Sequence, residues 1–211
     1  ADLDSGFPLK SGEGNADFSV TFWYKVKVAK KDNALFSKWA TGFARSVLLR
    51  DTNGTLEFWI GKWDGASYEL LENSLSTSVG RWYHVGATFN NTTRAWQLRV
   101  WDDTAGSEVL NASGTAANNI PFTNAPVAIG ASYKNGKPLT FDGLIDAVVD
   151  FDDILTTIEI DQISQGAYAY VSPSTTTTTT TTLPPGDYPT LSSATLGADG
   201  TTLTLVFNQS V

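Results

Sequence analysis

The segment that decides the fold class is DFSVTFWYKVKV, at residues 17–28. Apolar side chains at every second position from Phe18 to Val28 alternate with a second set that is polar apart from Trp23. A period of two places successive side chains on opposite faces of a strand, so that one face can be buried while the other stays open. The segment therefore predicts a long, half-buried β-strand.

Shorter alternating segments follow along the chain and are separated by turns rich in Gly and Asn. We expect them to be strands at residues 48–60 (a hairpin with its turn at 51–54), 85–89, 96–100, 127–129 and 145–151. One helix is predicted, because Thr156 and Glu159 form a capping box and Gly166 is a plausible end. The pattern predicts an all-β fold, an antiparallel two-sheet β-sandwich with one short helix near its C-terminal end.

A threonine-rich segment, SPSTTTTTTTTLPPGD at residues 172–187, divides the chain. Its β-branched residues and prolines favour an extended spacer over a packed core, and such linkers are typical of secreted modular proteins. After it, apolar alternation around a Gly-rich turn at residues 197–200 predicts a hairpin. We therefore expect a β-sandwich domain at 1–171, a linker at 172–187 and an incomplete second β domain at 188–211.

The composition excludes several kinds of partner and site. The 211 residues include 14 basic and 22 acidic ones, a net charge of -8, which disfavours binding to nucleic acid. The absence of cysteine excludes disulfides, thiolate metal sites and cysteine nucleophiles. No apolar stretch reaches the length of a membrane span, so we expect no membrane insertion.

Four segments, read in order, resemble the laminin-G-like branch of the concanavalin A-like lectin/glucanase superfamily. They are DFSVTFWYK at 17–25, LFSKW at 35–39, RWYHVGATF at 81–89 and FDGLID at 141–146. The third is close to the family signature W-x-H-V-A, whereas the usual Y-V-D-G hairpin is replaced by RVWDD at 99–103. The resemblance implies a jelly-roll sandwich over residues 1–171. The last residues are similar to the first strands of bacterial immunoglobulin-like repeats.

Catalytic patterns are missing from the sandwich segment. Some glucanases of the resembled superfamily carry two carboxylates as E-x-D-x-x-E or E-x-D-x-E on one strand, and this sequence has neither pattern. Glu69 and Glu72 are three residues apart and so point to opposite faces of a strand. His84, the single histidine, has no patterned partner, and the resemblance assigns it a structural position. These observations favour a noncatalytic domain and predict no catalytic residues.

Aromatic side chains are the candidates for binding a glycan, because their faces stack on the C–H-rich faces of sugar rings. Trp59 and Trp101 fall in the polar set of their strands, and the others lie near strand ends or turns. The predicted sugar-binding residues are Trp39, Trp59, Trp63, Trp101 and Tyr133. Packing inside the protein is the alternative for Trp59, Trp63 and Trp101, because large aromatics are buried on average. Trp23 matches a structural tryptophan of the family.

Asp146 is the candidate metal ligand. Strict alternation places it on the same face as Leu144 and Val148, which predicts a partly buried carboxylate that needs a partner. The resemblance implies a structural calcium ion on this aspartate, completed by backbone oxygens near the N-terminal strand. The alternative is that Asp146 accepts backbone N–H bonds without a metal.

The sequence thus predicts a noncatalytic carbohydrate-binding or adhesion module of a secreted multidomain protein, located outside the cell or on its surface. Its expected partners are a polysaccharide or glycan and further domains of the same chain. Two alternatives stay open, a glycoside hydrolase or polysaccharide lyase domain and a structural spacer in a surface protein.

Overall fold

The structure is a computed structural model that describes residues 9, 17–40, 44–62, 64, 67–134, 137–166, 190–196 and 203–208. The chain divides into two compact units, Ala1–Ala169 and Tyr170–Val211. The predicted linker at 172–187 lies outside the described residues, and the predicted domain limits stay predictions.

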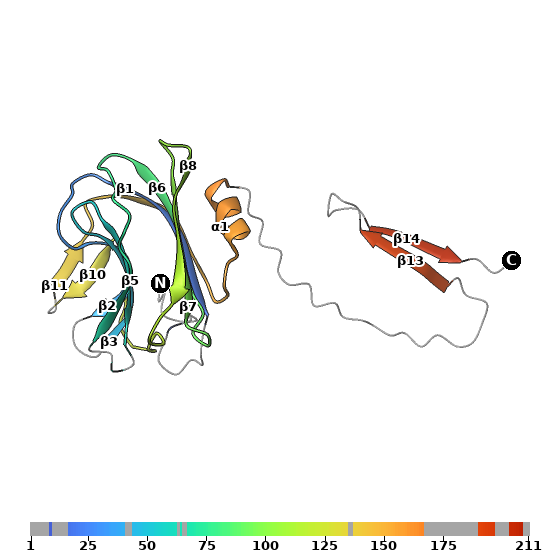
Figure 1. Ribbon diagram of the computed structural model, residues 1–211, viewed down its shortest axis with the longest axis horizontal. Helices are drawn as coiled ribbons and strands as arrows, with labels where there is room; N and C mark the ends of the chain where they lie inside the picture. The colour runs from blue at the N-terminus through green and yellow to red at the C-terminus, as the bar shows by residue number, and fades with distance from the viewer. Residues whose placement is uncertain are drawn as a thin grey trace. The chain divides into compact units, whose positions relative to one another are not determined.

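The first unit is a β-sandwich whose two sheets face each other in Figure 1. One sheet has five antiparallel strands. Their order is β12 (Gly143–Phe151), β1 (Phe18–Val26), β6 (Trp82–Phe89), β7 (Ala95–Asp102) and β8 (Ser107–Thr115). The central position of β1 and β6 explains why both need a fully apolar inner face.

The second sheet has seven strands. Along the main path their order is β11 (Lys137–Thr140), β10 (Ala131–Lys134), β2 (Asn33–Ala40), β3 (Ala44–Asp51), β4 (Leu56–Gly61) and β5 (Tyr68–Glu72). β9 (Val127–Ile129) pairs with β2, and the pairing of β10 with β2 is the one parallel contact described. The predicted all-β sandwich with one short helix is confirmed.

The core lies between the sheets and is built by the predicted alternation. Phe18, Val20, Phe22 and Tyr24 of β1 are all at most 1% exposed. Phe18 crosses to the other sheet and meets Phe36 with ring centroids 6.0 Å apart. Burial of these large side chains is the main driving force for closing the sandwich.

Helix α1 (Thr157–Ser164) packs on the outer face of the five-stranded sheet (Figure 1). The predicted capping box is present: Thr156 Oγ1 accepts from the Glu159 backbone N–H, and Glu159 Oε2 accepts from the Thr156 backbone N–H. Ile160 sits over Gly86, where a Cβ atom would lie 2.4 Å from Ile160 Cγ2. Gly86 therefore makes room for the helix.

Two polar contacts fix the same helix. Arg99 donates from Nε and Nη2 to the two carboxylate oxygens of Asp161, at 2.7 and 2.8 Å. The hydroxyl of Ser19 donates to the Asp153 carbonyl at 2.6 Å and accepts from the Leu155 backbone N–H at 3.0 Å. The bidentate pair and the bridging hydroxyl set where the helix lies on the sheet.

A β-bulge changes which side chains of β12 face the core. The register with β1 shifts between Thr21 and Trp23, and Ala147, in the middle of β12, has a φ of 49°. Beyond this point Val148 takes the inward position, whereas Asp146 is exposed. The prediction that Asp146 and Val148 share a partly buried face is therefore wrong, because an extra residue in one strand interrupts the period of two.

The second unit contains an antiparallel pair, β13 (Thr190–Leu196) and β14 (Leu203–Asn208). This pairing confirms the predicted hairpin. Its turn lies outside the described residues, and the immunoglobulin-like assignment stays a prediction.

Candidate functional site

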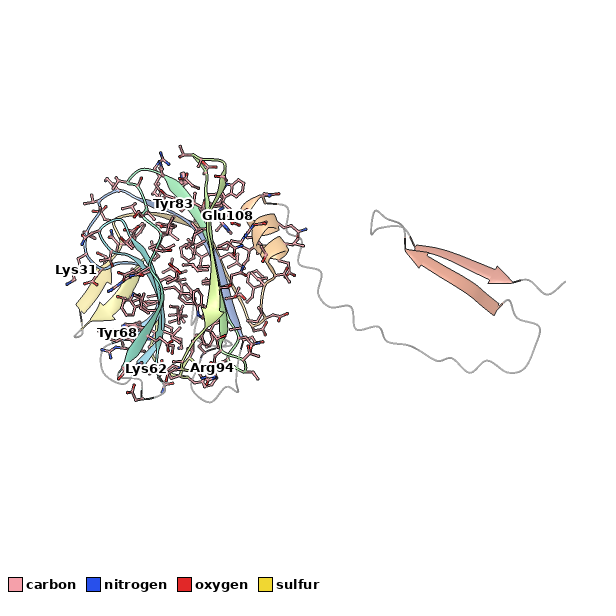
Figure 2. The ribbon with its side chains drawn as sticks, in the orientation of Figure 1. Lys31, Lys62, Tyr68, Tyr83, Arg94 and Glu108 are labelled. Carbon is pink, nitrogen blue, oxygen red and sulfur yellow. The ribbon has the colours of Figure 1, made fainter. Side chains whose placement is uncertain are left out.

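Three aromatic rings gather on the outer face of the seven-stranded sheet. Trp59 lies between Phe58 and Ile60, which face the core, so its ring points to the other side. The ring of Tyr68 is 5.1 Å from that of Trp59 and 6.1 Å from that of Trp39, centroid to centroid. Tyr68 is 52% exposed, and Figure 2 shows it on the side away from the five-stranded sheet. The rings thus form one group across β2, β4 and β5.

Two guanidinium groups pack against these rings. That of Arg45 lies 5.7 Å from the Trp39 ring and 5.5 Å from the Tyr68 ring, and that of Arg50 lies 5.3 Å from the Trp59 ring. These distances are within the range of cation–π contacts. We call Trp39, Trp59, Tyr68, Arg45 and Arg50 the aromatic–arginine face.

A carboxylate holds part of this face in place. Glu57 Oε2 accepts from Arg50 Nε at 2.6 Å and from Trp59 Nε1 at 2.7 Å. Arg50 also pairs with Asp32. The Trp59 indole is therefore fixed by a hydrogen bond on its edge and a cation over its face, while the aromatic surface is open in part to solvent. Such preorganisation lowers the entropic cost of binding a ligand.

The structure brings together only part of the predicted sugar-binding set. Trp39 and Trp59 lie in the aromatic–arginine face, whereas Trp101 lies on the outer face of the other sheet, where it pairs with His84 in register. Trp63 lies outside the described residues, as does the side chain of Tyr133. These assignments stay predictions. The sequence prediction did not include Tyr68, which joins the two indoles. The available signal was an aromatic residue next to Glu69, close to a predicted turn.

A second feature is a hollow of about 380 Å³ on the outer face of the five-stranded sheet. The described residues that line it are Trp23, Trp82, Asp103 and Asp146, and we call it the indole hollow. Trp23 pairs in register with Asp146 on one side and with His84 on the other. The resemblance implies a structural role for Trp23, and the structure shows in addition that its ring lines a surface depression.

His84 supports this face from below. It is 2% exposed, and its ring centroid is 5.2 Å from that of Trp23. Burial lowers the pKa of His84 to about 4, and the charge of Asp161 acts in the opposite direction without offsetting it. The imidazole is therefore neutral near pH 7, which agrees with a structural rather than an acid–base role.

The residues around Asp146 do not form a carboxylate-rich calcium site. The side chain is exposed, and its Oδ1 accepts from the Ala147 backbone N–H at 2.8 Å. Within the described ranges no group of three His, Cys, Asp or Glu is placed to hold an ion. The resemblance implies further backbone oxygens near the N-terminal strand, and of residues 1–16 only Leu9 is described. Calcium binding at Asp146 stays a prediction.

Comparison with known proteins identifies the family of the sandwich. A laminin G family model described as the concanavalin A-like lectin/glucanases superfamily matches residues 5–161. The chain belongs to this superfamily. A search of curated proteins found no match.

Several solved structures share the fold of this chain although their sequence identity to it is low. The CBM40 of the IT-sialidase of Ruminococcus gnavus is 14% identical with a TM-score of 0.57, covering 71% of this chain and 83% of that one. A putative carbohydrate binding protein of Bacteroides ovatus is 16% identical with a TM-score of 0.52, covering 74% and 42%. The LG1-3 region of the laminin α2 chain is 16% identical with a TM-score of 0.51, covering 69% and 30%. This chain thus spans less than half of the last two.

The described part of the chain contains no helix with the length and hydrophobicity needed to cross a bilayer.

Proposed function

We propose that this chain is a noncatalytic carbohydrate-binding module of a secreted multidomain protein, and that its glycan binds at the aromatic–arginine face. The observation that carries the proposal is the continuous group of Trp39, Tyr68 and Trp59 rings, with Tyr68 half exposed. Indole and phenol faces match the apolar faces of sugar rings, while tyrosine hydroxyl and guanidinium groups can bond sugar hydroxyls.

The carboxylates near this face do not have the environment of a hydrolase pair. Glu57 Oε2 accepts hydrogen bonds from both Arg50 and Trp59, so this carboxylate serves to position other side chains. A glycosidase needs two carboxyl groups at a fixed separation across the scissile bond, one of them kept protonated. Binding without cleavage is therefore the function that this geometry supports best.

The comparisons support the choice of ligand class. A second structure of the Ruminococcus gnavus CBM40 is bound to α2,3 sialyllactose, with a TM-score of 0.55 to this chain. Modules of this kind act through tethering to other domains, which raises their local concentration at the substrate. The threonine-rich segment at 172–187 would supply such a tether, and it supports an extracellular or cell-surface location.

The test is a glycan-array screen of the full chain, followed by calorimetric titration with the best oligosaccharide. Trp59→Ala and Tyr68→Ala should each weaken binding by about tenfold or more, as expected for aromatic anchors of a binding site. Trp101→Leu, on the other sheet, is the matched control and should bind as the wild type does. Circular dichroism would confirm that each variant is folded.

Two outcomes would contradict the proposal. Loss of binding in Trp101→Leu together with full binding in Trp59→Ala would move the site to the other sheet. Absence of binding to any glycan on the array would favour the structural spacer instead.

A further inference from the structure

The indole hollow brings together residues of three strands of the five-stranded sheet and of the turn that follows a fourth strand. Trp23 comes from β1, Trp82 from β6 and Asp146 from β12, opposite Trp23 in register. Asp103 follows β7, and its backbone N–H donates to the Trp82 carbonyl at 3.1 Å, which holds the turn against that indole. Its volume of about 380 Å³ lies near the lower end of ligand pockets, so it suits a small group.

Both acidic side chains of the hollow are exposed, and neither forms an ion pair with another described residue. Among the described residues, Asp146 Oδ1 accepts one hydrogen bond, from the Ala147 backbone N–H, which leaves capacity on the carboxylate for a ligand. Among the described residues, these two carboxylates outnumber the one ammonium group, that of Lys25, which approaches Trp82, so the hollow is locally negative in charge.

The indoles add attraction for the same kind of ligand, because the face of an aromatic ring carries partial negative charge. Lys25, which pairs with Trp82 in register, already places its ammonium group 5.9 Å from the Trp82 ring centroid. The Lys25 ammonium group thus already makes a cation–π contact with one wall of the hollow. The neutral imidazole of His84 below Trp23 adds no opposing charge near pH 7.

We propose that the indole hollow is a second ligand site, distinct from the aromatic–arginine face, and that it binds an ammonium group. The ammonium lies against the faces of Trp23 and Trp82 and is neutralised by Asp103 and Asp146. A bare divalent ion is a poorer match, because calcium requires six to eight oxygen ligands and indole rings supply none. Two classes of ligand carry such an ammonium group: molecules with a quaternary ammonium head group, and amino sugars with a protonated amine.

Calorimetric titration of the full chain in the presence of a chelator tests the proposal. It uses two pairs of ligands, each consisting of a cation and a neutral molecule of similar shape. Choline is compared with its neutral isostere 3,3-dimethyl-1-butanol, and glucosamine with N-acetylglucosamine. We expect at least one cation to bind about tenfold more tightly than its neutral partner, a difference of about 1.4 kcal/mol. Preference for choline alone identifies a quaternary head group, and preference for glucosamine alone identifies an amino sugar. Equal affinities within both pairs overturn the proposal.

Substitutions then locate the site. Affinity for the cation should fall by about tenfold in each of four variants that remove one contact. These variants are Trp23→Leu, Trp82→Leu, Asp103→Asn and Asp146→Asn. Lys25→Gln should instead tighten binding, because it removes a competing positive charge from Trp82, and this gain cannot come from a folding defect.

Matched controls lie outside the hollow, one on β7 of the same sheet and one directly after β12. Trp101→Leu removes an indole and Asp152→Asn removes an exposed carboxylate, and both should bind the cation as the wild type does. If the control variants lose as much affinity for the cation as the hollow variants do, the cation is attracted by the protein surface in general and the proposal is wrong. Neutral oligosaccharides report separately on the aromatic–arginine face, so either proposal can fail while the other stands.

Discussion

A buried carboxylate predicts an unusual dependence of stability on pH. Asp150 pairs in register with Val20, which is fully buried, and its Oδ1 has no hydrogen-bond partner among the described residues. Burial, and secondly the charge of Asp152, raises the pKa of Asp150 from 3.8 to about 7, against a hydrogen bond from the Phe151 backbone. The folded state therefore holds the Asp150 proton more tightly than the unfolded state does.

The sign and size of the effect follow from this difference. Because the folded-state pKa is raised, the contribution of Asp150 to stability is complete below pH 3.8 and is lost as the pH rises to about 7. The pKa of Asp150 is about 3 higher in the folded than in the unfolded state. At about 1.36 kcal/mol for each pH unit, this difference limits the effect on the free energy of unfolding to about 4 kcal/mol. Asp150→Asn cannot ionise, so it should match the wild type near pH 4 and exceed its stability by up to this amount near pH 8.

Urea unfolding of both proteins at a series of pH values measures the difference. All seven tryptophans precede the threonine-rich segment, so their fluorescence reports on the sandwich unit. Asp152→Asn serves as a second test, because removing its charge should move the transition to lower pH. Stability curves of the wild type and Asp150→Asn that stay parallel from about pH 4 to pH 8 would refute the reasoning.

Three further predictions concern other parts of the sandwich. Because the pKa of His84 is lowered to about 4, the contribution of the neutral imidazole to stability is complete above pH 6.5 and is lost as the pH falls through 4. In His84→Gln this loss of stability in acid, measured by urea unfolding, should be smaller by up to about 3 kcal/mol. Gly86→Ala should destabilise the sandwich by about 1–3 kcal/mol by overlap with Ile160, and the added change Ile160→Ala should recover part of that loss; simple additivity of the two changes would contradict the packing argument. If Asp146 holds calcium, millimolar calcium raises the melting temperature of the wild type but not of Asp146→Asn, whereas equal responses contradict the calcium prediction.

The sequence by itself determined the features that depend on neighbouring residues. Alternation at residues 17–28 gave β1 because a half-buried strand needs one apolar face, whatever it packs against. The capping box at Thr156 and Glu159 closes within three residues, so it fixed the start of α1. The turn at Asn53 and Gly54 has positive φ at both residues, which these two residue types tolerate best.

Only the tertiary structure decided which aromatic side chains meet. Tyr68 joins Trp39 and Trp59 because β2 to β5 pair one after another in a single sheet, and the positions of the three residues in the chain do not encode the register of these pairings, which shifts beside Trp59. The bulge at Ala147 reverses the alternation of β12 for the same reason, since it depends on how β12 pairs with β1. It turns Asp146 outward beside Trp23, and so completes a hollow whose walls come from four separate segments. Hydrogen bonding between distant strands sets this arrangement, and local residue patterns do not contain it.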